Sequence, residues 1–314
     1  MFRNRPVHFI HFILFCFLFP FSGRAQVDTA YVRPLEYKTG IRLYTGEKLL
    51  HLIYDDNRGT ERFFSPNSPL NFGLGLSIYN TVIGFDVGYG FRLKDKEKYG
   101  KTRSFDFQLH HYNRWFVLDV YIQQYTGFYE ESGREVFLHP DMKVNRYSIH
   151  SHYVFNHRRF SYKAAYAQTE RQVRSAGSWL LGAEYYRTRI RADEALTNEG
   201  YDRSDNFQVG VNGGYAYTWA LGRSWNIGIA STAGIAFGNE PFEGDDSRSV
   251  SVYPVVCPRF STVYDRNSWA LAVTYAGSIL FLPSGKEGKL NIHSGNVKFA
   301  FVKRFGKRIP PPEP

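Results

Sequence analysis

Histidines and serines close together are the residues of this chain whose spacing suggests chemistry. His150-Ser151-His152 lies in one alternating segment and His293-Ser294 in another. A serine hydrolase needs its nucleophile and base within about 3 Å of each other, together with a donor for the oxyanion. Adjacent residues of a strand point to opposite faces, so neither adjacent Ser–His pair could act alone. His150, His152 and His293 therefore stay candidate catalytic residues without an assigned partner.

The same two histidines suggest a metal. His150 and His152 are two residues apart, so on a strand both rings would lie on one face. A zinc site takes at least three protein ligands, and the sequence identifies no third one. We expect no metal and no other cofactor.

The first 25 residues have the pattern of an export signal. Arg3 and Arg5 precede an apolar stretch over residues 7–21, and small residues follow up to Ala25. The stretch is shorter than the roughly 20 residues of a membrane-spanning helix. We therefore expect Sec-type export, with cleavage after Ala25.

The composition restricts the class of protein. Aromatic residues make up 18% of the chain, and there are 28 glycines but only 2 cysteines. After Ala25 no apolar run is long enough for a membrane helix, and Cys257 alone cannot form an internal disulfide. The net charge of +10 is spread without a dense basic and aromatic block, so we expect no nucleic-acid partner. A membrane β-barrel, apolar outside and polar inside, fits all of these features.

Alternation of apolar and small or polar residues supports that class. It is clear over residues 70–78, 83–93, 207–219, 225–237 and 269–275, and the last such segment ends at Phe305. Such alternation over about 10 residues is typical of strands with one face toward lipid. We predict an all-β, transmembrane, antiparallel up-and-down β-barrel of about 12 strands, with 10 to 14 open.

The pattern also divides the chain. We expect a signal peptide at 1–25, an N-terminal periplasmic or plug segment at 26–69 that could contain one hairpin, a barrel at 70–305, and a basic, proline-rich tail at 306–314. The predicted strands lie at 70–79, 82–93, 103–112, 115–126, 144–155, 160–173, 179–190, 206–219, 224–238, 249–264, 268–281 and 290–305. Loop lengths alternate well in the second half but fall out of phase near 156–178, which indicates a wrong strand boundary or a long loop that faces inward.

Two further groups of residues follow from the alternation. Charged residues of the strands should face the interior, because lipid contact would be costly for them. These lumen-facing residues are Asp86, Arg92, Asp106, Asp119, Glu184 and Arg187. Amphipathic rings at strand ends are typical of an interfacial aromatic girdle, which we assign to Trp219, Trp225 and Trp269.

Short motifs in the chain resemble those of a Bacteroidetes family called domain of unknown function 4421. The motifs are Ser65-Pro66-Asn67, Tyr99-Gly100-Lys101-Thr102 and Tyr125-Thr126-Gly127-Phe128-Tyr129. The resemblance covers most of the chain after the signal and implies an exported outer-membrane-type barrel. It implies no activity, substrate or catalytic residue.

We therefore expect a cell outer-membrane barrel with a structural or narrow-solute transport role and no enzymatic activity. Its partners would be outer-membrane lipid and lipopolysaccharide, with the barrel-assembly machinery during insertion. Two alternatives stay open at this point, an outer-membrane lipid hydrolase and a soluble periplasmic β-protein. The sequence does not determine the oligomeric state.

Overall fold

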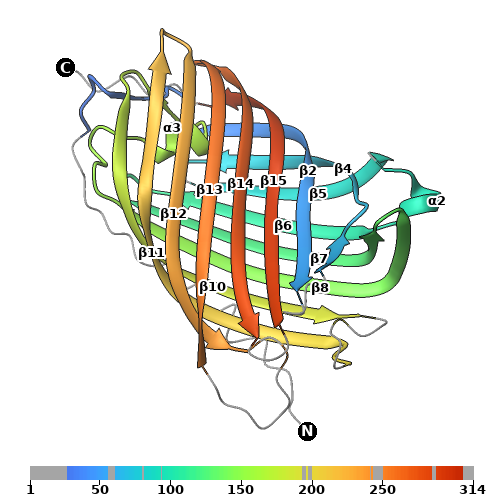
Figure 1. Ribbon diagram of the computed structural model, residues 1–314. Coiled ribbons are helices and arrows are strands. Elements are labelled where there is room, and N and C mark those ends of the chain that lie inside the picture. The colour runs from blue at the N-terminus through green and yellow to red at the C-terminus, as the bar shows by residue number, and fades with distance from the viewer. Residues whose placement is uncertain are drawn as a thin grey trace, which may run out of the picture.

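The computed structural model describes residues 27–306 except 56–60, 80, 93, 193–195, 197–199, 241, 243–249 and 285–287. This part of the chain is almost entirely antiparallel β-structure (Figure 1). None of its helices has the length and apolar character needed to cross a membrane. The elements are β1 (Val32–Pro34), β2 (Thr39–Asp55), β3 (Glu61–Ser65), β4 (Pro69–Ile78), β5 (Thr81–Arg92), α2 (Lys96–Tyr99), β6 (Arg103–Tyr112), β7 (Phe116–Ser132), β8 (Glu135–Val154), α3 (Tyr162–Tyr166), β9 (Glu170–Gln172), β10 (Ala176–Arg191), β11 (Arg203–Leu221), β12 (Trp225–Asn239), β13 (Val250–Arg266), β14 (Trp269–Ser284) and β15 (Gly288–Phe305).

Among the described residues, twelve strands close into a ring. It contains β2, β4 to β8 and β10 to β15 in chain order, each antiparallel to its neighbours. The last strand closes on the first, from Lys289 opposite Asp55 to Phe305 opposite Thr39. The prediction of an antiparallel up-and-down barrel is confirmed, and the closure leaves neither strand of this seam with an unpaired edge.

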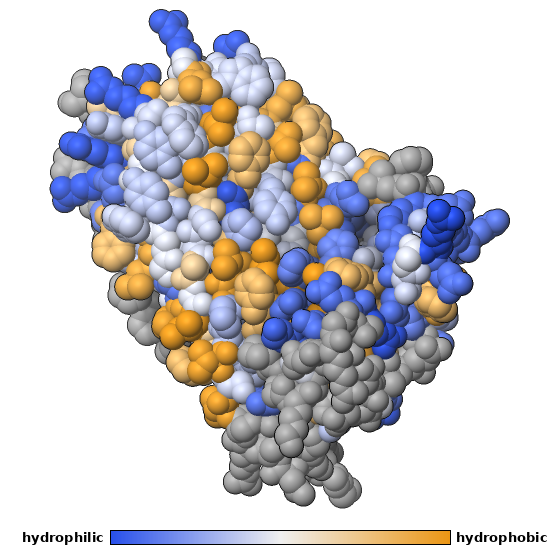
Figure 2. Space-filling view, viewed as in Figure 1, coloured by the Kyte–Doolittle hydropathy of each residue, from blue (hydrophilic) through white to orange (hydrophobic). Residues whose placement is uncertain are grey.

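The two faces of the wall follow the alternation in the sequence. Outward apolar side chains are about half exposed, while inward polar ones such as Gln208 and Asn212 are buried. Representative outward residues are Leu43, Leu74, Val211, Ile235 and Phe299, exposed between 47% and 59%. Hydrophobic and aromatic side chains cover much of the face shown in Figure 2, and hydrophilic ones gather toward its edges. The molecule is therefore apolar where a soluble protein would be polar.

The strand count is right, but two strand assignments are wrong. Residues 39–55 form β2 in the wall, so the barrel begins at Thr39 and not at residue 70. The alternation there is hidden because β2 carries apolar residues on both faces near its end, with Leu50 and Leu52 buried inside. A hairpin does form within 26–69, between β2 and β3, as part of the wall.

The second wrong assignment is the strand at 160–173. This segment contains α3 and the short β9, and it belongs to a long connection between β8 and β10. Ser161 caps the helix by accepting a hydrogen bond from Ala164 N at 3.1 Å, and two alanines follow inside the helix. This insertion explains why the alternation of long and short loops breaks near residues 156–178.

The wall loses two strands toward the end that carries the longer loops. There β3 pairs with both β2 and β7, so β4, β5 and β6 are bypassed and ten strands of the described chain complete the ring. β7 changes partner from β6 to β3 close to Gly127, whose φ is 90°. A Cβ at Gly127 would lie 2.2 Å from Lys101 O, so only glycine fits this bend.

The three motifs of the family resemblance meet at this junction. Thr102 Oγ1 donates to Gly127 O at 2.5 Å and accepts from Asn67 N at 2.8 Å. Asn67 Nδ2 donates to Gly100 O at 2.9 Å, and the rings of Tyr99 and Tyr129 pack edge to face. The motifs therefore hold the point where the wall divides.

Candidate functional site

The insertion between β8 and β10 closes the end of the barrel that carries the short turns. β9 pairs with β1, and α3 packs against the inner side of β12 and β13, near the upper end of the barrel in Figure 1. Ala165 of the helix approaches Gly228 of β12 so closely that a Cβ at that glycine would lie 3.0 Å from it. We call residues 156–175 the plug.

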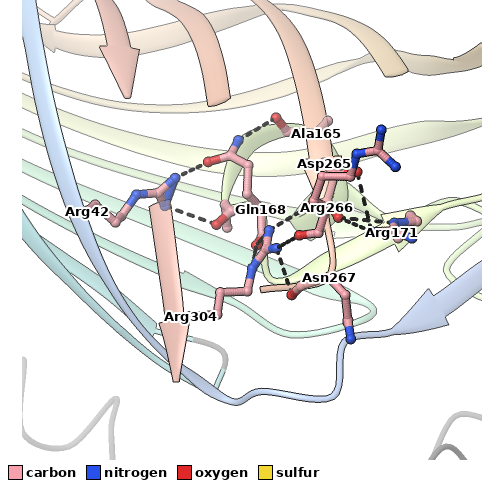
Figure 3. A network of polar contacts seen from close by, with 9 residues as sticks. Arg42, Ala165, Gln168, Arg171, Asp265, Arg266, Asn267 and Arg304 are labelled. Carbon is pink, nitrogen blue, oxygen red and sulfur yellow. Dashed lines mark hydrogen bonds and ion pairs between the residues drawn. The ribbon is translucent and has the colours of Figure 1, made fainter. Parts of the chain in front are cut away.

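Two buried arginines of the wall hold the plug (Figure 3). Arg42 of β2 donates to Ala167 O at 3.0 Å and to the side chain of Gln168. Arg304 of β15 donates to Gln168 O at 2.7 Å and to the carboxylate of Asp265. Asp265 also binds Arg171 of the plug. A guanidinium can satisfy several carbonyls at once, so two residues fix a whole loop.

A second ion cluster lies inside the plug. Burial opposes ionisation of Glu170, but Lys163 at 2.7 Å and Arg114 at 3.4 Å outweigh it and lower the pKa of Glu170. Ser161 Oγ donates to the same carboxylate at 2.7 Å. The carboxylate thus joins α3 to β9 and to the turn between β6 and β7.

Acid is expected to loosen the plug. Because the pKa of Glu170 is lower in the folded chain than the ordinary 4.5, its stabilisation is complete above that value and is lost as pH falls through the folded pKa. The cations around it are Lys38, Lys163 and Arg114. The protection factors of amide hydrogen exchange over residues 156–175, taken relative to the intrinsic exchange rate at each pH, should therefore fall in acid. Glu170→Gln is the control, with low protection at both pH values; wild-type protection factors that do not change in acid would contradict the assignment.

Next to the plug a buried ion pair crosses the interior. Arg259 Nη2 of β13 lies 2.6 Å from Asp119 Oδ2 of β7, and the chain separates the two by 140 residues. Tyr112 OH and His110 Nδ1 both bind Oδ1 of the same aspartate. Tyr112 packs edge to face on Tyr162 of the plug. The pair joins opposite walls and connects them to the plug.

Described residues of the interior line two cavities that share part of their lining. The larger of these two encloses about 680 Å³ of empty space and the smaller about 340 Å³, solvent at their openings included, and Tyr121, Arg259, Ala276 and Asn296 line both. Side chains bridge the wall around them, as where Arg146 Nη2 of β8 donates to Ser278 Oγ of β14 at 2.7 Å. The space is therefore a polar chamber crossed by fixed side chains.

The opposite end of the interior is packed with apolar side chains. Inward residues of strands around the wall, among them Leu52, Val144, Val255 and Leu280, form one buried cluster. Phe242, from the loop after β12, joins it and packs edge to face on Tyr54. The chamber thus lies between an apolar core and the plug.

The candidate catalytic histidines do not come together. His150 and His152 face the interior and are buried, whereas His293 lies on the outer face of β15 opposite His51. Ser294 faces inward, where its hydroxyl donates to Gln123 Oε1 at 3.3 Å. No Ser–His pair among these residues has the geometry of a nucleophile and its base.

The structure places the charged residues expected in the lumen on both faces of the wall. Asp106, Asp119 and Glu184 are buried inside the barrel. Arg187 is three residues from Glu184, so it points outward, where it pairs with Asp205 at 3.0 Å. The side chains of Asp86 and Arg92 fall outside the described residues.

The three tryptophans lie at the end with the short turns. Trp225 and Trp269 both pack against Tyr264, and Trp219 packs on Tyr217. All three face outward. With Tyr217 and Tyr264 they form a group of aromatic rings on β11 to β14.

A model of a known protein family matches most of the chain. The chain matches the family described as "Domain of unknown function (DUF4421)" over residues 26–305. The chain belongs to this family. A search of curated proteins finds no match. The description supplies no activity, so function has to be argued from the barrel itself.

Solved structures with some likeness to this DUF4421 protein are bacterial barrels. The translocator domain of autotransporter NalP from Neisseria meningitidis has 11% identity and a TM-score of 0.41, covering 85% of this chain and 88% of its own. The outer membrane protease OmpT from Escherichia coli has 8% identity and a TM-score of 0.38, covering 85% and 96%. The toluene transporter TodX of P. putida has 9% identity and a TM-score of 0.29, covering 85% and 90%. Such low scores carry no argument, and the fold of the DUF4421 protein rests on its own strand register.

Sequence reasoning missed the residues that close this DUF4421 barrel. The alternation did contain a signal for both arginines. Arg42 stands between the outward Ile41 and Leu43, and Arg304 directly precedes the outward Phe305, so both arginines must face inward. The alternation does not predict which residues of the plug these two arginines bind. They lie more than 120 residues away in the chain.

Proposed function

We propose that this protein is an outer-membrane β-barrel with a closed interior and a structural role, and not an open pore. The observation that carries the proposal is the closure of both ends, by the arginine-anchored plug at one and by the apolar core at the other. An open channel would need both obstructions to move.

The outer surface supports a membrane location. Apolar side chains project from strands around the wall at about half exposure. Contact of this apolar surface with water is unfavourable, and surrounding lipid would remove that contact. Trp219, Trp225 and Trp269 would lie at one lipid interface, as an aromatic girdle does. Short turns of outer-membrane barrels face the periplasm, so the plug would lie on the periplasmic side.

Partners follow from this location. Outer-membrane phospholipid and lipopolysaccharide would contact the outer face after Sec-type export. The barrel-assembly machinery would insert the chain, and β15 offers it a terminal strand with outward Val297, Phe299, Phe301 and Phe305. The barrel geometry is what supports each of these partners.

Fractionation and conductance test the proposal together. We expect the protein in the outer-membrane fraction, with faster gel migration before boiling than after it, because a closed barrel resists detergent. In planar bilayers the purified protein should give no stable single-channel steps. Release by osmotic shock would overturn the membrane location, and regular conductance steps from the wild-type chain would overturn the closed interior.

A further inference from the structure

Three side chains with metal-binding atoms meet inside the barrel. They are His150 of β8, Glu184 of β10 and Cys257 of β13, and one ligand atom of each lies within 4.8 Å of the other two. His150 and Glu184 are direct cross-strand partners, while Cys257 reaches them from across the interior. All three side chains are buried.

One carboxylate oxygen in this cluster has no other role. Glu184 Oε2 accepts hydrogen bonds from Asn212 Nδ2 at 2.9 Å and from Tyr186 OH at 3.2 Å. Glu184 Oε1 is buried and has no hydrogen-bond partner among the described residues. A buried carboxylate oxygen left without a donor is costly, so a ligand at this position would stabilise the site.

We propose that His150, Glu184 and Cys257 form a binding site for a divalent cation of the zinc class. Imidazole, carboxylate and thiolate are the ligands that zinc takes in proteins, and three of them leave a fourth position open. Tetrahedral zinc places neighbouring ligand atoms about 3.5 Å apart. Cys257 Sγ and His150 Nδ1 are 4.0 Å apart, so small side-chain movements suffice.

Charge also favours a divalent ion. The carboxylate of Glu184 and the thiolate of Cys257 would together neutralise it, which a buried site requires. Two guanidiniums, those of Arg146 and Arg259, line the smaller cavity together with His150. These positive charges oppose the ion, so both anionic ligands are required, and they favour water, hydroxide or a small anion as the fourth ligand.

The surroundings already orient the ligands. His150 packs edge to face between the rings of Tyr121 and Tyr186, with centroids 5.9 Å and 5.1 Å away. Asn212 and Tyr186 fix the Glu184 carboxylate, and Tyr186 OH also lies 3.4 Å from Cys257 Sγ. Supporting contacts of this kind are typical of metal sites, where their loss weakens binding about 10- to 100-fold.

Cobalt binding tests the site. The full-length protein is folded in detergent, stripped with a chelator and titrated with cobalt chloride, followed by the thiolate-to-cobalt charge-transfer absorption. We expect stoichiometric binding that zinc displaces. Cys257→Ser should abolish the band, His150→Ala and Glu184→Gln should weaken binding by at least about 10-fold, and Asn212→Ala by about 10- to 100-fold.

Two controls keep the test decisive. His152→Ala removes a buried histidine on the same face, two residues away, and should bind cobalt as the wild type does. Heat-modifiable migration shows that each variant is folded, and zinc should protect Cys257 from alkylation in the wild type but not in His150→Ala. Absence of the band in folded wild-type protein, or its persistence in Cys257→Ser, would overturn the proposal. The result is independent of conductance, so it fails separately from the closed-barrel function.

Discussion

Replacing Arg304 by alanine is expected to release the plug and to lower the free energy of unfolding by about 3–5 kcal/mol. The change leaves Gln168 O and Asp265 without the guanidinium that binds both, in a buried region. Asp265 keeps Arg171 as its remaining cation. Chemical unfolding in detergent measures the loss, and hydrogen exchange should localise it to residues 156–175.

Arg189→Ala is the matched control for this prediction. Arg189 also pairs with a carboxylate, that of Asp205 at 3.0 Å, but both side chains are about half exposed. Exposed ion pairs contribute about 0–1 kcal/mol, because water and salt screen them. Equal losses for the two variants would show that Arg304 does not act as a buried anchor.

The outer face of the barrel could be predicted from the sequence, because lipid-facing alternation is a local property. Residues 207–219 illustrate this, with Val209 and Val211 exposed and Gln208 and Asn212 buried as the pattern requires. β2 was not predicted as a strand of the wall, because Leu50 and Leu52 face an apolar core inside the barrel. With apolar residues on both faces, the segment does not show the alternation that marks the other strands.

The interior could not be predicted, because its contacts join strands that are distant in the chain. Glu184 and Cys257 lie 73 residues apart in the chain, and their meeting depends on how the ring closes. The spacing of His150 and His152 predicts two rings on one face of a strand. The residues that cluster with His150, Glu184 and Cys257, come from other strands. Only His150 of the two lies in the three-residue cluster.

Local sequence also failed at the plug, for a different reason. Residues 160–173 contain enough aromatic residues to resemble a strand, yet Ser161 and two alanines start a short helix there. Tertiary contacts to Arg42 and Arg304 then hold the segment inside the ring. The one sign of this insertion in the sequence was that the alternation of long and short loops breaks near residues 156–178.

Replacing Asp119 by alanine is expected to destabilise the barrel by about 3–5 kcal/mol. The guanidinium of Arg259 would stay buried without its carboxylate, and Tyr112 OH would lose its acceptor. Equilibrium unfolding in detergent measures the effect. Since Tyr112 packs on Tyr162 of the plug, hydrogen exchange should also accelerate there.

The double variant Asp119→Leu with Arg259→Met separates the charge from the packing. Breaking a buried pair is costly mainly because one ion is left alone, and apolar replacement of both partners is often close to neutral. We therefore expect the double variant to be more stable than Asp119→Ala, although His110 and Tyr112 still lose their acceptor. Additive losses would mean that Asp119 and Arg259 act independently. Recovery would show that the loss in Asp119→Ala comes mainly from the guanidinium left buried without its carboxylate.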